Sequence, residues 1–168
     1  RAVACDHLTG LANRRALFEA CDLELLRWRR APRPLSLMLI DVDHFKRIND
    51  RHGHQSGDQS LIEIAHACQQ TLRKTDLLAR FGGEEFIVLL PETGQREAVR
   101  LAERMRSAVA SEVRLPGSGR PGEVTISLGA VALSRSTPSL DVLIQAADLA
   151  LYDAKRAGRD RVHTMPAP

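Results

Sequence analysis

The segment from Leu35 to Val42 constrains the fold of this 168-residue chain more than any other feature. It is a short, nearly continuous apolar run, with Pro32 and Pro34 before it and charged residues after it. Such a run between turn and charge signals is typical of a strand that is covered on both faces. The segment is therefore predicted to be a buried central strand.

The remaining elements are predicted from apolar periodicity and from glycine and proline positions. Helices are expected near residues 14–30, 61–72, 98–109 and 140–151, and further strands at 77–80, 86–90 and 123–133. From Leu35 onward this gives the order β-α-β-β-α-β, with an added N-terminal helix and a C-terminal αβ element. The predicted class is α+β, a ferredoxin-like split βαβ with a central antiparallel sheet flanked by helices. Its first and third strands are adjacent, so the Gly82-Gly83 hairpin tip is expected beside the end of the Leu35 strand.

Length and composition predict one domain over residues 1–168, since 43% of the residues are hydrophobic. The 24 basic and 21 acidic residues nearly balance, which argues against a nucleic-acid surface. Three cysteines without a C-x-x-C pair favour a reducing, cytoplasmic compartment. No apolar run is long enough to span a membrane. The chain starts without Met, so we expect it to be cut from a longer sensor protein, and no membrane contact by this domain is expected.

Acidic residues gather at two points that the predicted topology brings together. Asp41 and Asp43 end the central strand, and Glu84 and Glu85 follow the two glycines of the hairpin. Converging carboxylates repel one another unless a cation lies between them, and oxygen ligands suit Mg²⁺ or Mn²⁺. The alternative for each pair alone is a strand end and a solvated turn.

The segment after Asp43 has the composition of a nucleotide site. Its chain turn offers free backbone N–H groups to a polyphosphate, with Lys46 close by, although no G-x-x-x-x-G-K-[ST] loop is present. Asn49 and Asp58 match the hydrogen-bonding edges of guanine, and the alternative for Asp58 is a helix N-cap. The neighbouring histidines 52 and 54 lack further metal ligands and are interpreted as turn residues.

Several segments together resemble the GGDEF family over nearly the whole chain. They are Asp6-His7-Leu8-Thr9-Gly10-Leu11-Ala12-Asn13-Arg14-Arg15, Asp41 to Asp50, Gly53 to Asp58, Arg80-Phe81-Gly82-Gly83-Glu84-Glu85-Phe86, Ser127-Leu128-Gly129 and Leu151 to Arg159. The resemblance implies a nucleotidyl cyclase or polymerase-palm-like fold. It also implies a diguanylate cyclase that condenses two GTP into cyclic di-GMP and two pyrophosphates across a face-to-face homodimer.

The same resemblance implies a role for each matching residue. The two metal ions would bind Asp41, the carbonyl of Val42 and Glu84, and either Glu84 or Glu85 would assist proton transfer. The remaining implied contacts to GTP come from the amides of His44 and Phe45, and from Lys46, Asn49, Asp58, Lys155 and Arg159. For Lys155 and Arg159 the alternative is stabilisation by the dipole of the last helix. The family usually has Asn where this chain has Asp160.

A product-inhibition site is also implied by the resemblance. Arg73 and Asp76 form an R-x-x-D pattern five residues before Gly82-Gly83. Arg104 matches a further arginine of the site, and cyclic di-GMP would bind there. The alternative is a helix end in an arginine-rich chain.

Three other functions remain open from the sequence besides the cyclase, whose parent chain is expected to carry an N-terminal sensor or receiver domain. The first is a catalytically silent regulatory module that binds GTP or cyclic di-GMP. The second is a cyclase with relaxed base choice, which the Asp58 carboxylate disfavours. The third is a polymerase palm, which would need a basic template groove that the charge balance does not provide.

Overall fold

A computed structural model describes residues 4–134 and 139–166. Its centre is a five-stranded sheet in the order β2-β3-β1-β4-β5. The strands are β1 (Leu35–Val42), β2 (Leu77–Arg80), β3 (Glu85–Pro91), β4 (Ile126–Ala132) and β5 (Val162–Thr164). All pairs are antiparallel except β4 with β5, which are parallel. The predicted α+β class and the adjacent, antiparallel first and third strands are confirmed.

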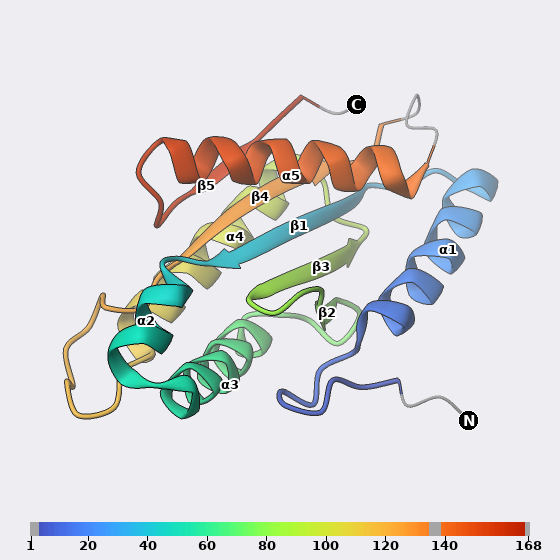
Figure 1. Ribbon diagram of the computed structural model, residues 1–168. Helices are drawn as coiled ribbons and strands as arrows, with labels where there is room; N and C mark the ends of the chain where they lie inside the picture. The colour runs from blue at the N-terminus through green and yellow to red at the C-terminus, as the bar shows by residue number, and fades with distance from the viewer. Residues whose placement is uncertain (1–3, 135–138, 167–168) are drawn as a thin grey trace.

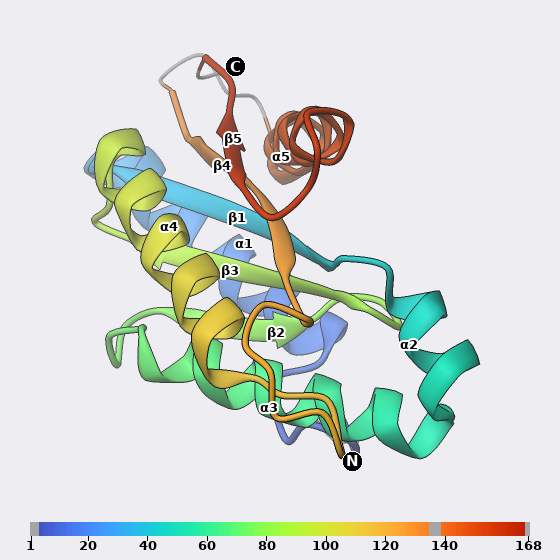
Figure 2. The ribbon, with the colours of Figure 1, turned by 90° about the vertical axis from the view of Figure 1, so that its left-hand side faces the viewer.

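The helices cover both faces of the sheet (Figures 1 and 2). They are α1 (Arg14–Arg30), α2 (Phe45–His52), α3 (His54–Gln70), α4 (Gln95–Glu112) and α5 (Leu140–Arg156). All eight residues of β1 are buried, as the sequence predicted for a central strand. Because side chains alternate along a strand, Met38 and Ile40 pack toward α3 and α4, while Leu37 and Leu39 pack toward α1 and α5.

The start of one helix differs from the sequence prediction in a way that affects the site. The helix expected from residue 61 begins seven residues earlier, at His54. Gly53, with φ of 89°, is both the C-cap of α2 and the N-cap of α3, so one left-handed glycine separates two helices. Asp58 consequently lies inside α3 and does not cap it, which removes the alternative role for its carboxylate.

Gly129 sets the position of α5 on the sheet. A Cβ atom on this residue of β4 would lie 2.2 Å from the carbonyl oxygen of Ala147 and 2.5 Å from the amide nitrogen of Leu151. Only glycine allows the helix backbone to approach the strand so closely. The Ser127-Leu128-Gly129 motif therefore fixes the helix that carries Lys155.

Candidate active site

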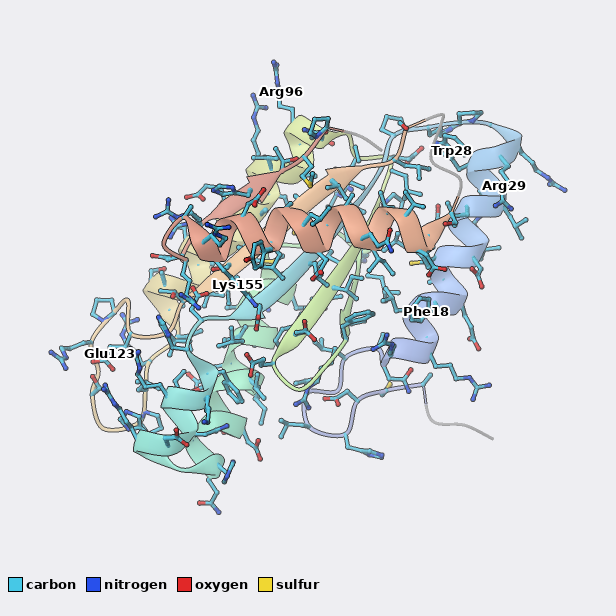
Figure 3. All side chains as sticks on the ribbon, turned by 45° about the horizontal axis from the view of Figure 1, so that its top comes forward. Phe18, Trp28, Arg29, Arg96, Glu123 and Lys155 are labelled. Carbon is cyan, nitrogen blue, oxygen red and sulfur yellow. The ribbon has the colours of Figure 1, made fainter. Side chains whose placement is uncertain are left out.

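Asp41 is the centre of the candidate site. It lies near the end of β1, opposite Glu85 of β3 and Ser127 of β4, and it is 6% exposed. Its Oδ2 atom accepts a hydrogen bond from the Nζ atom of Lys155, which reaches over from the end of α5 (Figure 3). Its Oδ1 atom is buried and has no hydrogen-bond partner among the described residues. A buried carboxylate oxygen left in this state costs about 1–3 kcal/mol or more, which a cation would offset.

Glu84 is the second carboxylate of the site. Its backbone oxygen accepts a hydrogen bond of 3.1 Å from the amide of Val42, which holds the hairpin tip against the end of β1. Burial first, and then the negative charge of Asp41, raise the pKa of Glu84 to about 7. The structure therefore brings Asp41 and Glu84 together, as their positions in the sequence predicted.

Glu85 lies beside this pair on the same face of the sheet. Burial first, and then the charge of Asp41, raise the pKa of the Glu85 carboxyl above its ordinary value. Within residues 4–134 and 139–166, no group of three or more His, Cys, Asp or Glu side chains is arranged to hold a metal ion by itself. Mg²⁺ is often held by one or two carboxylates, with water and substrate phosphates as its other ligands. The unpartnered Oδ1 atom of Asp41 and the neighbouring Glu84 fit this pattern.

Asp43 has a different role from Asp41, although both residues end the same strand. Its carboxylate accepts hydrogen bonds from the hydroxyl groups of Thr125 (2.7 Å) and Ser127 (2.6 Å) and from the amide of Asp160 (3.0 Å). These three bonds tie the end of β1 to β4 and to the turn after α5. Sequence reasoning did not find this anchor, since its partners lie more than 80 residues away.

Arg80 supports the glycine turn and was also missed from the sequence. Its guanidinium group donates hydrogen bonds to the carbonyl oxygens of Gly82 (3.2 Å) and Gly83 (2.6 Å), and to the carboxylate of Asp6 (3.2 Å). Asp6 in turn accepts hydrogen bonds from the amide and hydroxyl groups of Thr9. The N-terminal motif therefore holds the loop that carries Glu84. The sequence did contain a signal for this contact, because Asp6 and Arg80 each begin a family motif and neither had been assigned a role.

Asn49 and Asp58 lie on neighbouring helices, with Gly57 between them in space. A Cβ atom on Gly57 would lie 1.8 Å from the Oδ1 atom of Asn49, so the glycine makes room for the amide. The Oδ1 atom is buried and has no hydrogen-bond partner among the described residues. Asp58 is exposed on α3. Asn49 thus has an amide oxygen without a partner among the described residues, and Asp58 has an exposed carboxylate; both kinds of group can hydrogen-bond a base.

The N-terminus of α2 supplies the backbone groups that were predicted to hold phosphate. His44 is the N-cap with φ of 52°, and no side chain caps the helix. The N–H groups of the first turn, beginning at Phe45, have no partners within the helix. Lys46 is exposed beside them. Arg159 lies in the turn after α5 with φ of 63°, and its amide donates a hydrogen bond to the oxygen of Ala154.

The residues predicted for product inhibition form a separate cluster. Arg73 donates to both carboxylate oxygens of Asp76, at 3.2 and 2.9 Å, and also to the carbonyl oxygen of Pro91. Arg104 reaches from α4 to the carbonyl oxygen of Thr71, two residues before Arg73. Pro91 ends β3, whereas Glu85 begins it. The cluster and the carboxylate pair therefore lie at opposite ends of one strand, roughly 20 Å apart at the usual rise per residue.

The split βαβ sheet, with two carboxylates at the end of its central strand, places the chain in the palm-like α+β class. The model of the family described as "Diguanylate cyclase, GGDEF domain" matches residues 3–161. The chain belongs to this family, which confirms the resemblance inferred from the motifs.

The relatives extend well beyond this domain. The chain is 46% identical over 157 residues to diguanylate cyclase DgcP of Pseudomonas aeruginosa, covering 94% of this chain and 23% of DgcP. It is 42% identical over 165 residues to diguanylate cyclase DosC of Escherichia coli, covering 98% of this chain and 36% of DosC. The chain thus spans about a quarter to a third of these two curated relatives.

Solved structures share the same fold. The crystal structure of diguanylate cyclase SiaD from Pseudomonas aeruginosa, in complex with its activator SiaC, has a TM-score of 0.89 at 41% identity. This likeness covers 98% of the present chain and 62% of that one. The GGDEF domain of DgcB from Caulobacter crescentus, in complex with c-di-GMP, has a TM-score of 0.90 at 32% identity, and the coverage is 98% and 96%. None of the helices in the described part of this chain is long and apolar enough to cross a bilayer.

Proposed function

We propose that the chain is a diguanylate cyclase domain that converts two GTP molecules into cyclic di-GMP and two pyrophosphates. The observation that carries this proposal is the meeting of Asp41 and Glu84, with one buried carboxylate oxygen lacking a partner and Lys155 in contact with the other. Family membership and the names of the relatives DgcP and DosC support the choice of reaction.

The reaction needs two domains face to face, each holding one GTP. The 3′-hydroxyl oxygen of each nucleotide forms a bond to the α-phosphorus of the other, the bond from that phosphorus to the β-phosphate oxygen breaks, and pyrophosphate leaves. The hydroxyl proton must pass to a base. Asp41, the carbonyl of Val42 and Glu84 would hold two Mg²⁺ or Mn²⁺ ions, which polarise the phosphate and lower the pKa of the hydroxyl when bound.

Glu85 is the better candidate for the base, because Glu84 is engaged as a ligand. Burial and the charge of Asp41 raise the pKa of the Glu85 carboxyl above its ordinary value, which makes it a stronger base than an exposed glutamate. Lys155 would move from Asp41 to the triphosphate once a cation takes its place at the carboxylate. The backbone of His44 and Phe45, together with Lys46 and Arg159, would hold the remaining phosphate charge.

Asn49 and Asp58 would select guanine. The Asp58 carboxylate can accept hydrogen bonds from N1–H and N2–H of guanine, whereas adenine presents no donor at N1. Its exposed position on α3 and the room that Gly57 leaves for Asn49 support this role.

Cyclic di-GMP would inhibit the enzyme at Arg73, Asp76 and Arg104. Guanidinium groups bind phosphate and the Hoogsteen edge of guanine through paired donors. The roughly 20 Å between this cluster and the carboxylate pair supports a mode of inhibition in which the product restrains the approach of two domains and does not compete directly with GTP. The parent chain would supply a sensor or receiver domain that controls this approach, in the cytoplasm.

Product formation from GTP tests the proposal. Purified chain with Mg²⁺ should convert GTP, and not ATP, to a cyclic dinucleotide, with a rate that depends on the square of enzyme concentration at high dilution. Glu84→Gln should be inactive, and the matched variant Glu112→Gln, altered at the exposed end of α4, should retain activity. A rate linear in enzyme down to monomeric dilution would refute the paired-site mechanism. Tight GTP binding without turnover would instead favour the silent module.

A further inference from the structure

The turn between α5 and β5 is strained. Gly158 has φ of 122°, and the next two residues, Arg159 and Asp160, have φ of 63° and 47°. A side chain in this left-handed region costs about 1 kcal/mol or more per residue, so two in succession persist only where the surroundings hold them. Arg159 is one of the residues proposed to bind the triphosphate, and its position depends on whatever holds this turn.

Two contacts hold Asp160 from either side. Its amide donates a hydrogen bond to Asp43, the anchor that also binds β4 and follows Asp41 by two residues. Its Oδ1 atom accepts a hydrogen bond of 2.8 Å from Arg106, which lies 54 residues earlier on α4. The turn is thus fastened to the end of β1 by its backbone and to α4 by its charge.

Arg106 is more buried than an ordinary surface arginine and pairs with two carboxylates. Its side chain is 21% exposed and it also donates to both carboxylate oxygens of Glu103 on its own helix. Hydrogen bonds to Glu103 and Asp160 raise the pKa of the Arg106 guanidinium group, so it stays charged at any working pH. Without it, the carboxylates of Glu103 and Asp160 would both lose this counter-charge, and Asp160 directly follows Arg159.

We propose that Arg106 is a positioning residue that neutralises Asp160, so that the turn carrying Arg159 attracts a triphosphate. This inference rests on the proposed function. A carboxylate within one residue of a phosphate-binding arginine opposes substrate binding unless it is paired. Arg106 removes this repulsion and, through the same contact, holds a strained turn in place.

A double-mutant cycle separates charge compensation from a purely structural tie. The ligand is 3′-deoxy-GTP with Mg²⁺, which lacks the attacking hydroxyl and so reports binding alone in calorimetry. Arg106→Gln should weaken binding roughly five- to tenfold, a coupling in the usual range for two linked sites. Asp160→Asn should bind at least as tightly as the wild type, and Arg106→Gln combined with Asp160→Asn should return to within about twofold of Asp160→Asn alone.

Controls make each outcome decisive. Arg96→Gln removes an exposed arginine from the start of α4, which Figure 3 shows pointing away from the protein, and should leave binding unchanged. The loss in Arg106→Gln should shrink at high salt and should appear in KM for GTP more than in kcat. Thermal unfolding checks that each variant is folded. Arg106→Lys keeps the positive charge and should recover part of the affinity that Arg106→Gln loses.

The inference is overturned if Asp160→Asn weakens binding as much as Arg106→Gln and the double variant is no better. It is also overturned if Arg106→Gln binds 3′-deoxy-GTP as the wild type does. Failure of the wild type itself to bind 3′-deoxy-GTP would overturn the proposed function instead.

Discussion

Substitution of Glu84 by Gln should make the metal-free protein more stable while destroying its activity. In the absence of a cation, the ionised Glu84 side chain faces the buried carboxylate of Asp41. Gln keeps the shape and can donate a hydrogen bond to Asp41, but it carries no charge. The variant therefore removes a repulsion that the wild type tolerates because the site has to bind a cation.

The size of the effect follows from the pKa of Glu84, which rises from 4.5 to about 7 in the folded protein. At full burial such a change corresponds to roughly 3 kcal/mol of unfavourable ionisation. Solvent screening of this partly exposed side chain lowers the expected gain in unfolding free energy to about 1–2 kcal/mol.

The stability difference between Glu84→Gln and the wild type should depend on pH. Well below pH 4.5, Glu84 is protonated in both folded and unfolded states, so its charge makes little difference between wild type and variant. Between pH 4.5 and about 7, the unfolded chain loses its proton while the folded chain keeps it, and the wild type loses stability as pH rises. The advantage of Glu84→Gln should therefore grow through this window and remain constant above about pH 7.

Urea unfolding in the presence of a chelator measures this difference across the pH range. The exposed variant Glu112→Gln should show no comparable trend. Added Mg²⁺ should stabilise the wild type, and should stabilise Glu84→Gln far less. A Glu84→Gln protein that is less stable than the wild type above pH 7, without metal, would refute the argument that the two carboxylates repel each other.

Four further outcomes are expected. The affinity of the protein for Mg²⁺, measured by calorimetry, should fall by up to about tenfold per pH unit below pH 7, because a proton competes for Glu84; an affinity unchanged between roughly pH 6 and 8 would contradict this. Arg73→Ala should relieve inhibition by cyclic di-GMP in initial-rate assays, and should lower the unfolding free energy by about 1–3 kcal/mol because the Asp76 carboxylate is fully buried; an unaltered inhibition constant would remove Arg73 from that site. Gly129→Ala should destabilise the fold by about 3 kcal/mol or more in urea unfolding, since its Cβ would meet the backbone of α5; wild-type stability would show that the helix can shift. Asp58→Ala should raise the relative use of ATP in competition assays read by mass spectrometry, and an unchanged preference for GTP would assign base choice elsewhere.

The candidate site could be predicted from the sequence where two residues lie at the ends of neighbouring strands. Asp41 and Glu84 follow directly from the topology, because an antiparallel pairing of β1 with β3 puts the hairpin tip beside the end of β1. Asn49 and Asp58 were predicted as a pair that could select guanine, with a helix N-cap as the alternative for Asp58. The structure removes that alternative, since the positive φ of Gly53 starts α3 earlier than the apolar periodicity indicates.

Contacts between distant side chains could not be predicted in this way. Lys155 was expected to contact the triphosphate of GTP. In the structure it contacts the buried carboxylate of Asp41. The support of the glycine turn by Arg80 and the pairing of Arg106 with Asp160 were not anticipated either. Each joins elements whose relative positions depend on how helices are seated on the sheet.

The sequence by itself determined the order of the strands and of every helix except the short α2, the burial of β1 and the family, because apolar periodicity and motif spacing are local properties of the chain. Only the tertiary structure decided which carboxylate is left without a partner. Asp41 is the second-last residue of β1 and Asp43 directly follows the strand, yet Asp43 accepts hydrogen bonds from two hydroxyl groups and an amide, while one oxygen of Asp41 has no partner among the described residues. That difference arises from the packing of β4 and α5 against the end of β1, and it is what prepares Asp41 to bind a cation.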